Sequence, residues 1–313
     1  VRKQEAKPFL TDTNTLYSGS RHNAVDHMET AISHGFAPSV VGAPVLIADG
    51  LRGENAEEVA IGCKHIQTAI IAGMITRAQS MMVLSHFKGH EMAGFGGAIK
   101  NLAMGCAPSA GKKAQHAVRF TVNEDTCTGC GTCMAVCPQG AAQVAEEKAS
   151  IDSELCIGCG ECLAQCEDKA VTIDWKADIP PFMERMTEYA LAAVKHKQRK
   201  TGYLNFLINI TPDCDCVPWT DAPIVPDIGI LASKDPVAID TASFEMVKQA
   251  KGRKESHLKD NHGEDEDKFK GVWDYTQGEI QLHYGEEIGL GSMDYELIPM
   301  DEEKPKQLSD VVW

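Results

Sequence analysis

The sequence predicts an α/β fold with a mostly parallel sheet and helices on both faces, interrupted by a small cysteine-rich α+β module. Three observations lead to this prediction. Apolar runs of strand length alternate with helical segments along most of the 313 residues, a pattern typical of parallel sheets. Eight of the twelve cysteines fall between residues 127 and 166. The chain is also long enough to bury a hydrophobic core without disulfide bonds.

Two buried strands and two helices are expected before the cysteines. The runs VGAPVLIADG (41–50) and SMMVLSHF (80–87) are apolar and end in glycine or polar residues, as strands at the centre of a sheet do. Residues 26–34 (DHMETAISH) predict a helix that Gly35 stops. The stretch IQTAIIAGMITRA (66–78) predicts a second helix, between the two strands.

The elements after the cysteines continue the alternation. Residues 180–200 predict a helix with proline in its first turn, acids early and Lys or Arg late, which complements the helix dipole. Asp235 followed by proline predicts the start of a helix over 235–250. The charged segment 251–267 is expected to be a loop. Strands are expected at YLNFLINI (203–210), PDIGILA (226–232) and, at the sheet edge, YELIPM (295–300).

This alternation predicts one discontinuous α/β domain, made of residues 1–116 and 176–313, into which residues 117–175 are inserted. In open α/β sheets, ligands bind beyond the carboxyl ends of the strands. The segment 89–106, GHEMAGFGGAIKNLAMGC, directly follows the strand SMMVL and its SHFK extension. We therefore expect a ligand site at this segment.

Composition and charge exclude several classes of function. The net charge of −15 disfavours binding to nucleic acid or to an anionic membrane surface, because both need clustered Lys and Arg. No apolar run reaches the roughly 18 residues that span a bilayer, and the first residues lack the apolar core of a secretory signal. A cytoplasmic protein is expected, in which the cysteines are metal ligands or reactive thiols rather than disulfides.

The eight clustered cysteines form two C-x2-C-x2-C-x3-C runs with matching flanks, which indicates an internal duplication. Glycines between the first three cysteines of each run allow a tight loop around a cubane cluster. The fourth cysteine is expected to begin a helix and to serve the other cluster. One [4Fe–4S] cluster is then held by Cys127, Cys130, Cys133 and Cys166, and the second by Cys156, Cys159, Cys162 and Cys137.

This segment resembles the bacterial two-cluster ferredoxin family over residues about 120 to 175, which implies a ferredoxin-like fold and electron transfer. The alternatives are a zinc site or a disulfide framework, although zinc sites usually use pairs of CxxC. The first run ends in Cys137 and proline, as the family's does, but Cys166 is followed by Glu167 and Asp168. These two carboxylates are expected to lower the potential of the neighbouring cluster.

Residues 120–175 carry ten acidic residues against two lysines. Such a surface is either simply solvated or a docking surface for a redox partner protein with a basic face, because complementary charge raises the encounter rate. The sequence does not indicate an oligomeric state.

The glycine-rich segment lacks the known nucleotide-binding patterns. A P-loop or a dinucleotide fingerprint counted from Gly94 would need glycine at position 99, which is isoleucine. The glycines instead allow close approach of the backbone to an additional, unidentified metal or organic cofactor. The alternative is a packed loop with solvated Lys and His, in which Cys106 is a small buried hydrophobe. The expected cofactor-binding residues are Gly94, Gly96, Gly97, Lys100, Cys106 and His116, and the expected catalytic residues include His90 and Lys100.

Nearly the whole chain is similar to the uncharacterised iron–sulfur-centre protein family labelled domain of unknown function 362, and this resemblance implies a redox function in anaerobes. The segments that carry it are DTNTLYSGSRHNAVDHMETA, LIADGLRG, VLSHFKGHEMAGFGGAIKNLAMGC, CDC at 214–216 and PDIGILASKDPVAID.

A shorter stretch, HEMAGFGGAIK, is similar to the H-x-x-AG-x-x-GG-x-K segment of the nickel-dependent lactate racemase family. That resemblance implies that His90 is a catalytic acid or base, that Lys100 carries a nickel pincer nucleotide and that His116 binds nickel. SGSRHN is similar to the segment with that family's other catalytic histidine, which would be His22. The glycine pattern and several neighbours differ, and a ferredoxin module is foreign to racemases.

Cys214 and Cys216 lie at the end of the strand YLNFLINI. A C-x-C pair there can ligate a metal or act as a redox dithiol, and two structural thiols in a turn are the alternative. Asp213 and Asp215 are expected to raise the pKa of both thiols and to oppose a thiolate, unless a cation is bound. Cys63 has no ligand constellation around it and is expected to be structural.

Three hypotheses of function follow. The first, which we favour, is an oxidoreductase or oxidoreductase subunit that passes electrons through two [4Fe–4S] clusters to a cofactor or substrate site in the α/β domain. Its support is the size of that domain, which a carrier does not need. The second is a pure ferredoxin-type electron carrier. The third is a racemase-like metal-cofactor enzyme, or a scaffold that delivers clusters or metals.

Overall fold

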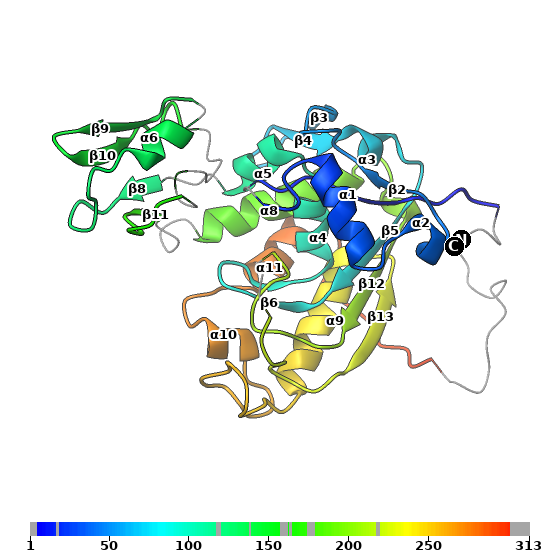
Figure 1. Cartoon of the computed structure of the whole chain (residues 1–313). Helices are drawn as coiled ribbons and strands as arrows, with labels where there is room; N and C mark the ends of the chain where they lie inside the picture. Colours follow the sequence, from blue (N-terminus) through cyan, green and yellow to red (C-terminus); the bar gives the residue numbers. More distant parts are fainter. Residues whose placement is uncertain are drawn as a thin grey trace.

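A computed structural model describes residues 5–16, 19–116, 120–137, 139–156, 162, 165–173, 179–216 and 220–300 of the protein. The architecture is mixed α/β. Figure 1 shows a larger body that contains most of the helices and, beside it, a smaller module formed by the elements from β8 to β11. The buried apolar side chains form two clusters, one in the larger body and one in the module.

The main sheet has three strands in the order β13, β12, β5. β5 (Met81–His86) and β12 (Thr201–Leu207) pair in parallel, whereas β13 (Gly229–Ser233) pairs antiparallel with β12. All three strands were predicted, but the sheet is mixed instead of mostly parallel. The described residues between β12 and β13 form no helix, whereas a parallel pair is usually joined by a helical crossover.

Two further sheets of the larger body have two strands each. β1 (Leu10–Asp12) pairs in parallel with β2 (Val45–Ile47), which confirms the strand predicted at 41–50 in a shorter form. β3 (Ala56–Ala60) pairs antiparallel with β4 (Thr68–Ala72). The helix predicted over 66–78 is therefore wrong in its first half, and only α3 (Gly73–Arg77) is helical. Thr and two Ile residues in β4 favour a strand because β-branched side chains pack well on a pleated surface.

The other predicted helices are confirmed as α1 (Ala24–Ser33), α8 (Ile179–Val194) and α9 (Pro236–Gln249). α9 begins where the sequence predicts, because the Asp235 carboxylate accepts hydrogen bonds from the first free amides of the helix. The strand predicted at 295–300 is wrong: these residues are exposed and pair with no described strand.

α4 (Ala98–Gly105) packs between α8 and the main sheet and follows a hairpin of β6 (Lys88–His90) and β7 (Gly94–Gly96). In the part of the chain that the structure describes, no helix could cross a membrane. The remaining elements of the larger body are α2 (Pro38–Val41), α5 (Ser109–His116), the 3-10 helix η2 (Gln198–Lys200), α10 (Lys268–Val272) and α11 (Ile280–Glu287).

The small module contains two antiparallel strand pairs, which are β8 (Phe120–Val122) with β11 (Val171–Ile173), and β9 (Ala142–Ala145) with β10 (Lys148–Ile151). Helix α6 (Thr132–Val136) ends at Cys137, so the prediction that the fourth cysteine of this run begins a helix is wrong.

The first cysteine loop makes the predicted tight turn. Gly129 and Gly131 have positive φ angles of 68° and 80°, a conformation that glycine adopts without strain. The corresponding loop of the second run, residues 157–160, lies outside the described residues.

Candidate functional site

Four cysteines from the two runs surround one small cavity in the module. Cys127, Cys130 and Cys133 belong to the first run, and Cys166 is the last cysteine of the second run. Cys127 and Cys133 are buried, whereas Cys130 is exposed. The fold therefore brings together, around one cavity, the four residues that the spacing assigns to one site.

Backbone amides are directed at the sulfur atoms of these cysteines. The amide of Ala149 donates to Cys127 Sγ at 3.4 Å, and the amide of Ala170 donates to Cys166 Sγ at 3.2 Å. Hydrogen bonds to ligand sulfurs stabilise the thiolate form and tune the potential of a bound cluster. All described cysteines are free thiols, so no disulfide occupies their ligand atoms.

The second predicted ligand set is described only in part. Cys137 Sγ accepts hydrogen bonds from the amides of Ala141 and Ala142 at 3.2 and 3.5 Å, and these amides help to lower the pKa of Cys137 even though burial acts in the opposite direction. Cys156 and Cys162 belong to the described residues, while Cys159 lies outside them.

A second group of reactive side chains lies in the larger body, at the carboxyl end of the parallel strands β5 and β12. β5 leads into the β6–β7 hairpin, which carries His90, and β12 leads into the segment 211–216, which carries Cys214 and Cys216. The amide of Gly89 donates to Thr211 O at 2.9 Å, so the hairpin and this segment lie in contact. The ligand site predicted at this strand edge thus has a physical basis in the parallel β5–β12 pair.

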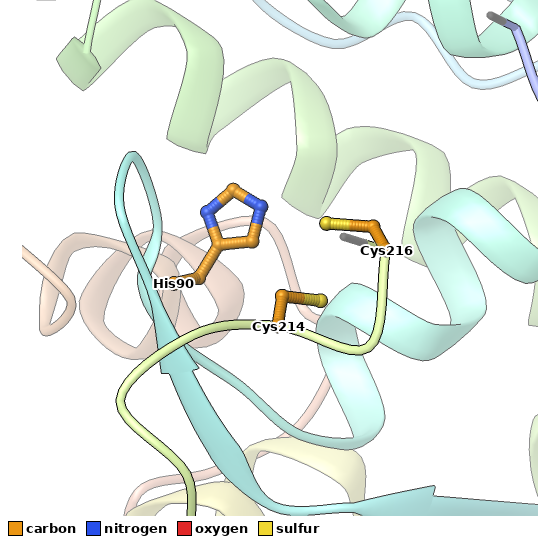
Figure 2. A group of neighbouring side chains, drawn as sticks. All are labelled: His90, Cys214 and Cys216. Carbon is orange, nitrogen blue, oxygen red and sulfur yellow. The ribbon is translucent and has the colours of Figure 1, made fainter. Parts of the chain in front are cut away.

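His90, Cys214 and Cys216 converge at this edge, and their ligand atoms all lie within 4.8 Å of one another (Figure 2). Lys100 joins them from α4, because its Nζ donates to Cys214 Sγ at 3.3 Å. His90 and Cys214 are only 5% exposed and Lys100 is 8% exposed. His90 and Lys100, from two other segments, therefore lie near the Cys214 sulfur in a nearly closed environment.

The charges around Cys214 favour its thiolate. A hydrogen bond from Cys216 and the positive charge of Lys100 lower the pKa of Cys214 well below its usual value, although burial opposes this. The same hydrogen bond, together with burial, raises the pKa of Cys216. Burial alone would favour a neutral Lys100 amine, but the negative charge of Cys214 outweighs it and raises the pKa of Lys100. The pair is therefore a thiolate and a thiol beside an ammonium group.

Asp215 does not act on the cysteines as the sequence predicts. Its carboxylate pairs with Lys88 Nζ at 3.1 Å and with His86 Nδ1 at 3.0 Å, so these two side chains compensate its negative charge. The expectation that neighbouring aspartates oppose a thiolate is wrong for Cys214, because Lys100 supplies the cation that the sequence argument required.

The hydrogen bonds of His90 define which of its nitrogens holds the proton. Nδ1 accepts from the amides of Met92 and Ala93, both at 3.0 Å. Burial and the charge of Lys100 lower the pKa of His90, so the ring is neutral. A neutral ring whose Nδ1 is an acceptor has its proton on Nε2. In Figure 2 this second nitrogen lies on the side of the ring that faces Cys216.

Other predicted site residues have different surroundings. His116, at the end of α5, donates from Nδ1 to Lys112 O at 2.7 Å, and burial lowers its pKa to about 4. The positive charge of Lys100 contributes to this lowering, which indicates that His116 lies near Lys100. Cys106 lies in the hydrophobic core, where burial raises its pKa to about 12 and keeps the thiol protonated. His22 is exposed in the turn before α1.

Protein atoms fill the space beside the glycines of the predicted cofactor loop. A Cβ on Gly94 would lie 2.9 Å from Gly278 Cα, one on Gly96 would lie 2.9 Å from Lys100 Cδ, and one on Gly97 would lie 2.3 Å from Asp240 Oδ1. These glycines permit close packing of the hairpin and α4 against their neighbours. Their binding of a cofactor stays a prediction.

Two residues that the sequence did not single out support the site. Asp240 on α9 accepts from the amides of Ala98 and Ile99 at 2.7 and 2.9 Å, so it holds the first turn of the helix that carries Lys100. Arg21 donates to Cys216 O at 3.3 Å. An acid in the middle of the apolar helix 235–250 was the available signal for Asp240, because a buried carboxylate needs partners.

One family model matches the chain. The model described as Domain of unknown function (DUF362) matches residues 1–245, a range that includes the cysteine module and all the residues that meet Cys214. No curated protein matches the chain.

Proposed function

The chain belongs to the DUF362 family, and from this premise and the cysteine geometry we propose that it is an iron–sulfur redox protein with two [4Fe–4S] clusters. The observation that carries the proposal is the cavity lined by Cys127, Cys130, Cys133 and Cys166. Three ligands from one run and the fourth from the other run form the ligand set of a two-cluster module. A bound cluster supplies one-electron transfer.

The shape of the cysteine loop favours an iron–sulfur cluster over zinc, because four thiolates alone can bind either. Each site offers thiolate sulfur only, and the sulfurs of Cys127, Cys137 and Cys166 accept backbone hydrogen bonds. A structural zinc site needs four ligands around one small ion, whereas a cubane needs a glycine-lined loop that wraps around it. Gly129 and Gly131 give the loop this shape through their positive φ angles.

We further propose that the clusters serve a reaction in the larger body, which makes the chain an oxidoreductase or a subunit of one. Support comes from the Cys214 site, where a buried thiolate, an ammonium group and a neutral imidazole meet. Perturbed groups of this kind concentrate at functional sites. The residues of this site hold a negative charge on Cys214, keep water away from it and present the Nε2 proton of His90.

The alternatives predict different chemistry at the same residues. A pure electron carrier needs no chemistry at Cys214. A racemase-like enzyme would need Lys100 as the attachment point of a cofactor, but its Nζ is a protonated ammonium bound to Cys214, and an ammonium group is not a nucleophile. We therefore place the oxidoreductase ahead of the racemase, and we propose a redox partner with a basic face to match the acidic module.

Electron paramagnetic resonance of the anaerobic full-length protein tests the proposal. After reduction, signals of two interacting [4Fe–4S] clusters are expected, and Cys166→Ala should remove the signal of one cluster. Cys63→Ser is the matched control, because Cys63 lies in the larger body outside both predicted ligand sets. A spectrum without cluster signals, or equal loss in both variants, would contradict the proposal.

A further inference from the structure

The Cys214 site contains three groups that are close enough to hold a metal ion, yet two features oppose a cation there. The lone pair of His90 Nδ1 is occupied by two backbone amides, and Nε2 holds the proton. A metal-ligating histidine instead donates its second N–H to an acceptor and offers a free lone pair to the metal. His90 has the opposite arrangement and would have to lose its last ring proton to bind a metal.

The second feature is the Lys100 ammonium. Its Nζ lies 3.3 Å from Cys214 Sγ, in a side chain that is 8% exposed. A metal ion on the same sulfur would face this positive charge at short range, where little water screens it. Lys100 thus already occupies the position of the counter-cation for the Cys214 thiolate.

The same geometry suits a pair of cysteines that react with each other. Cys214 and Cys216 are two residues apart in a turn, and their sulfur atoms lie within 4.8 Å of each other. In Figure 2 the sulfur of Cys216 points toward the His90 ring, whereas the sulfur of Cys214 points away from the ring. Cys214 is buried and Cys216 is only partly buried, so the two residues of the pair differ in exposure. This asymmetry is typical of reactive dithiols, in which a stabilised thiolate lies next to a protonated thiol.

The site also lies near the point where the cysteine module joins the larger body. The positive charge of Lys100 acts on His116, which is the last residue of α5. The chain reaches Phe120, the first residue of the module, four residues later. Four residues of extended chain span at most about 14 Å, so the module begins close to His116.

We propose that Cys214 and Cys216 form a redox-active pair that cycles between a disulfide and a dithiol and collects two electrons that the cysteine module delivers one at a time. This inference rests on the proposed iron–sulfur function. The electrons come from an external one-electron carrier by way of the two clusters.

The chemistry balances with water as the proton source. Two electrons break the Sγ–Sγ bond, and one proton enters from solvent through the partly exposed Cys216, which leaves a Cys216 thiol and a Cys214 thiolate. The Lys100 ammonium stabilises the Cys214 thiolate, and neither Lys100 nor His90 gives up a proton. In the reverse direction, the S–S bond forms, two electrons leave and the Cys216 proton returns to water.

The test uses the full-length protein, purified without oxygen and with its clusters. Two samples are oxidised with diamide, a thiol oxidant. One of them is afterwards reduced with dithionite. Both samples are quenched in acid, alkylated and digested, and the mass of the peptide that contains residues 214–216 is measured by mass spectrometry. We expect an unalkylated peptide with a Cys214–Cys216 disulfide after oxidation and a doubly alkylated peptide after reduction. A peptide that is fully alkylated after diamide treatment would overturn the inference.

A cluster-depleted variant, Cys127→Ala with Cys137→Ala, removes one ligand from each predicted cluster and tests the source of the electrons. Dithionite should reduce the disulfide at least about tenfold more slowly in this variant, because the electrons then lack their path. Equal rates would overturn the relay. Absence of iron and sulfide from the wild-type protein would instead refute the proposed function, whatever the state of the disulfide, so the two failures are distinguishable.

Lys100→Met tests the role of the ammonium group. Loss of the charge should make the disulfide more stable relative to the dithiol by about tenfold, which is a shift of about 30 mV to lower potential for a two-electron couple. Lys100→Arg should keep most of the wild-type potential. An unchanged potential in Lys100→Met, or one equivalent of a metal other than iron that Cys214→Ser removes, would overturn the proposal. The wild-type mass measurement remains decisive if a variant fails to fold.

Discussion

Gly89→Ala tests whether close backbone approach builds the Cys214 site. Gly89 lies in β6, next to His90, and a Cβ at this position would lie 2.0 Å from Pro212 O. Real Cβ atoms essentially never come closer than 3.0 Å to another atom, and the obstacle here is backbone, which cannot rotate away. The hairpin and the segment 211–216 must therefore separate by at least about 1 Å.

The separation has two expected effects. Overpacking of this kind costs about 1–3 kcal/mol of folding free energy, which lowers the melting temperature by about 2–4 °C per kcal/mol in a chain of this size. It also moves His90 away from Cys214 and opens the site to water. We expect faster alkylation of Cys214 and Cys216 in the native variant, because their sulfurs become accessible.

Thermal scans of the full-length protein and timed alkylation, followed by peptide mass, measure both effects. Gly202→Ala is the matched control: Gly202 lies in β12, and a Cβ there meets only the flexible end of Met82 at 3.1 Å. If Gly89→Ala melts and reacts like Gly202→Ala, the close contact between β6 and Pro212 does not shape the site, and the reasoning fails.

Three more predictions follow from the same contacts. Asp240→Asn replaces an acceptor of backbone amides at the start of α4, so it should lower the free energy of unfolding by about 2 kcal/mol in denaturant titrations, whereas Glu245→Gln on the same helix should be neutral. Burial favours neutral His86, but the hydrogen bonds and charge of Asp215 outweigh it and raise the pKa of His86. The His86–Asp215 pair should therefore stabilise the fold fully below the unfolded-state pKa of about 6.5, and this stabilisation of about 0.5 kcal/mol should be lost as pH rises through the folded-state pKa. Thermal scans at a series of pH values should show this loss, and Asp215→Asn should abolish it. Asp168 lines the four-cysteine cavity, so Asp168→Asn should raise the midpoint of that cluster by some tens of millivolts in a redox titration, and an unchanged midpoint would count against the predicted effect of this carboxylate.

The cysteine module could be predicted because its ligand loop is specified by residues that are close together in the sequence. The first loop needs only cysteines at fixed spacing and glycines that accept positive φ. The long-range part, Cys166 meeting the first run, followed from the repeat itself. The helix before Cys137 was misplaced because the spacing of four ligands does not specify which residues between them are helical.

Helices were predicted correctly where a capping residue marks their first residue. Asp235 before proline marked the start of α9 correctly. The apolar run at 66–78 carried no capping residue, and its first half became β4 through pairing with β3, which no local pattern reveals. The strand β13 was predicted but its antiparallel direction was not, since strand direction depends on the connection.

The chemistry at Cys214 depended on partners far away in sequence. His90, Lys100 and Cys214 were each singled out, but only the fold shows that Lys100 contacts the sulfur and that Asp215 is neutralised by other groups. The neighbouring acids predict a raised pKa for Cys214, but Lys100, 114 residues away in the sequence, contacts the sulfur and helps to lower that pKa.

Iron and acid-labile sulfide per chain test the central claim most directly. Anaerobically purified full-length protein should contain about eight iron atoms and about eight sulfides, and Cys166→Ala should lose about half of each. Zinc at a similar stoichiometry without sulfide, or iron and sulfide unaffected by loss of Cys166, would contradict the account.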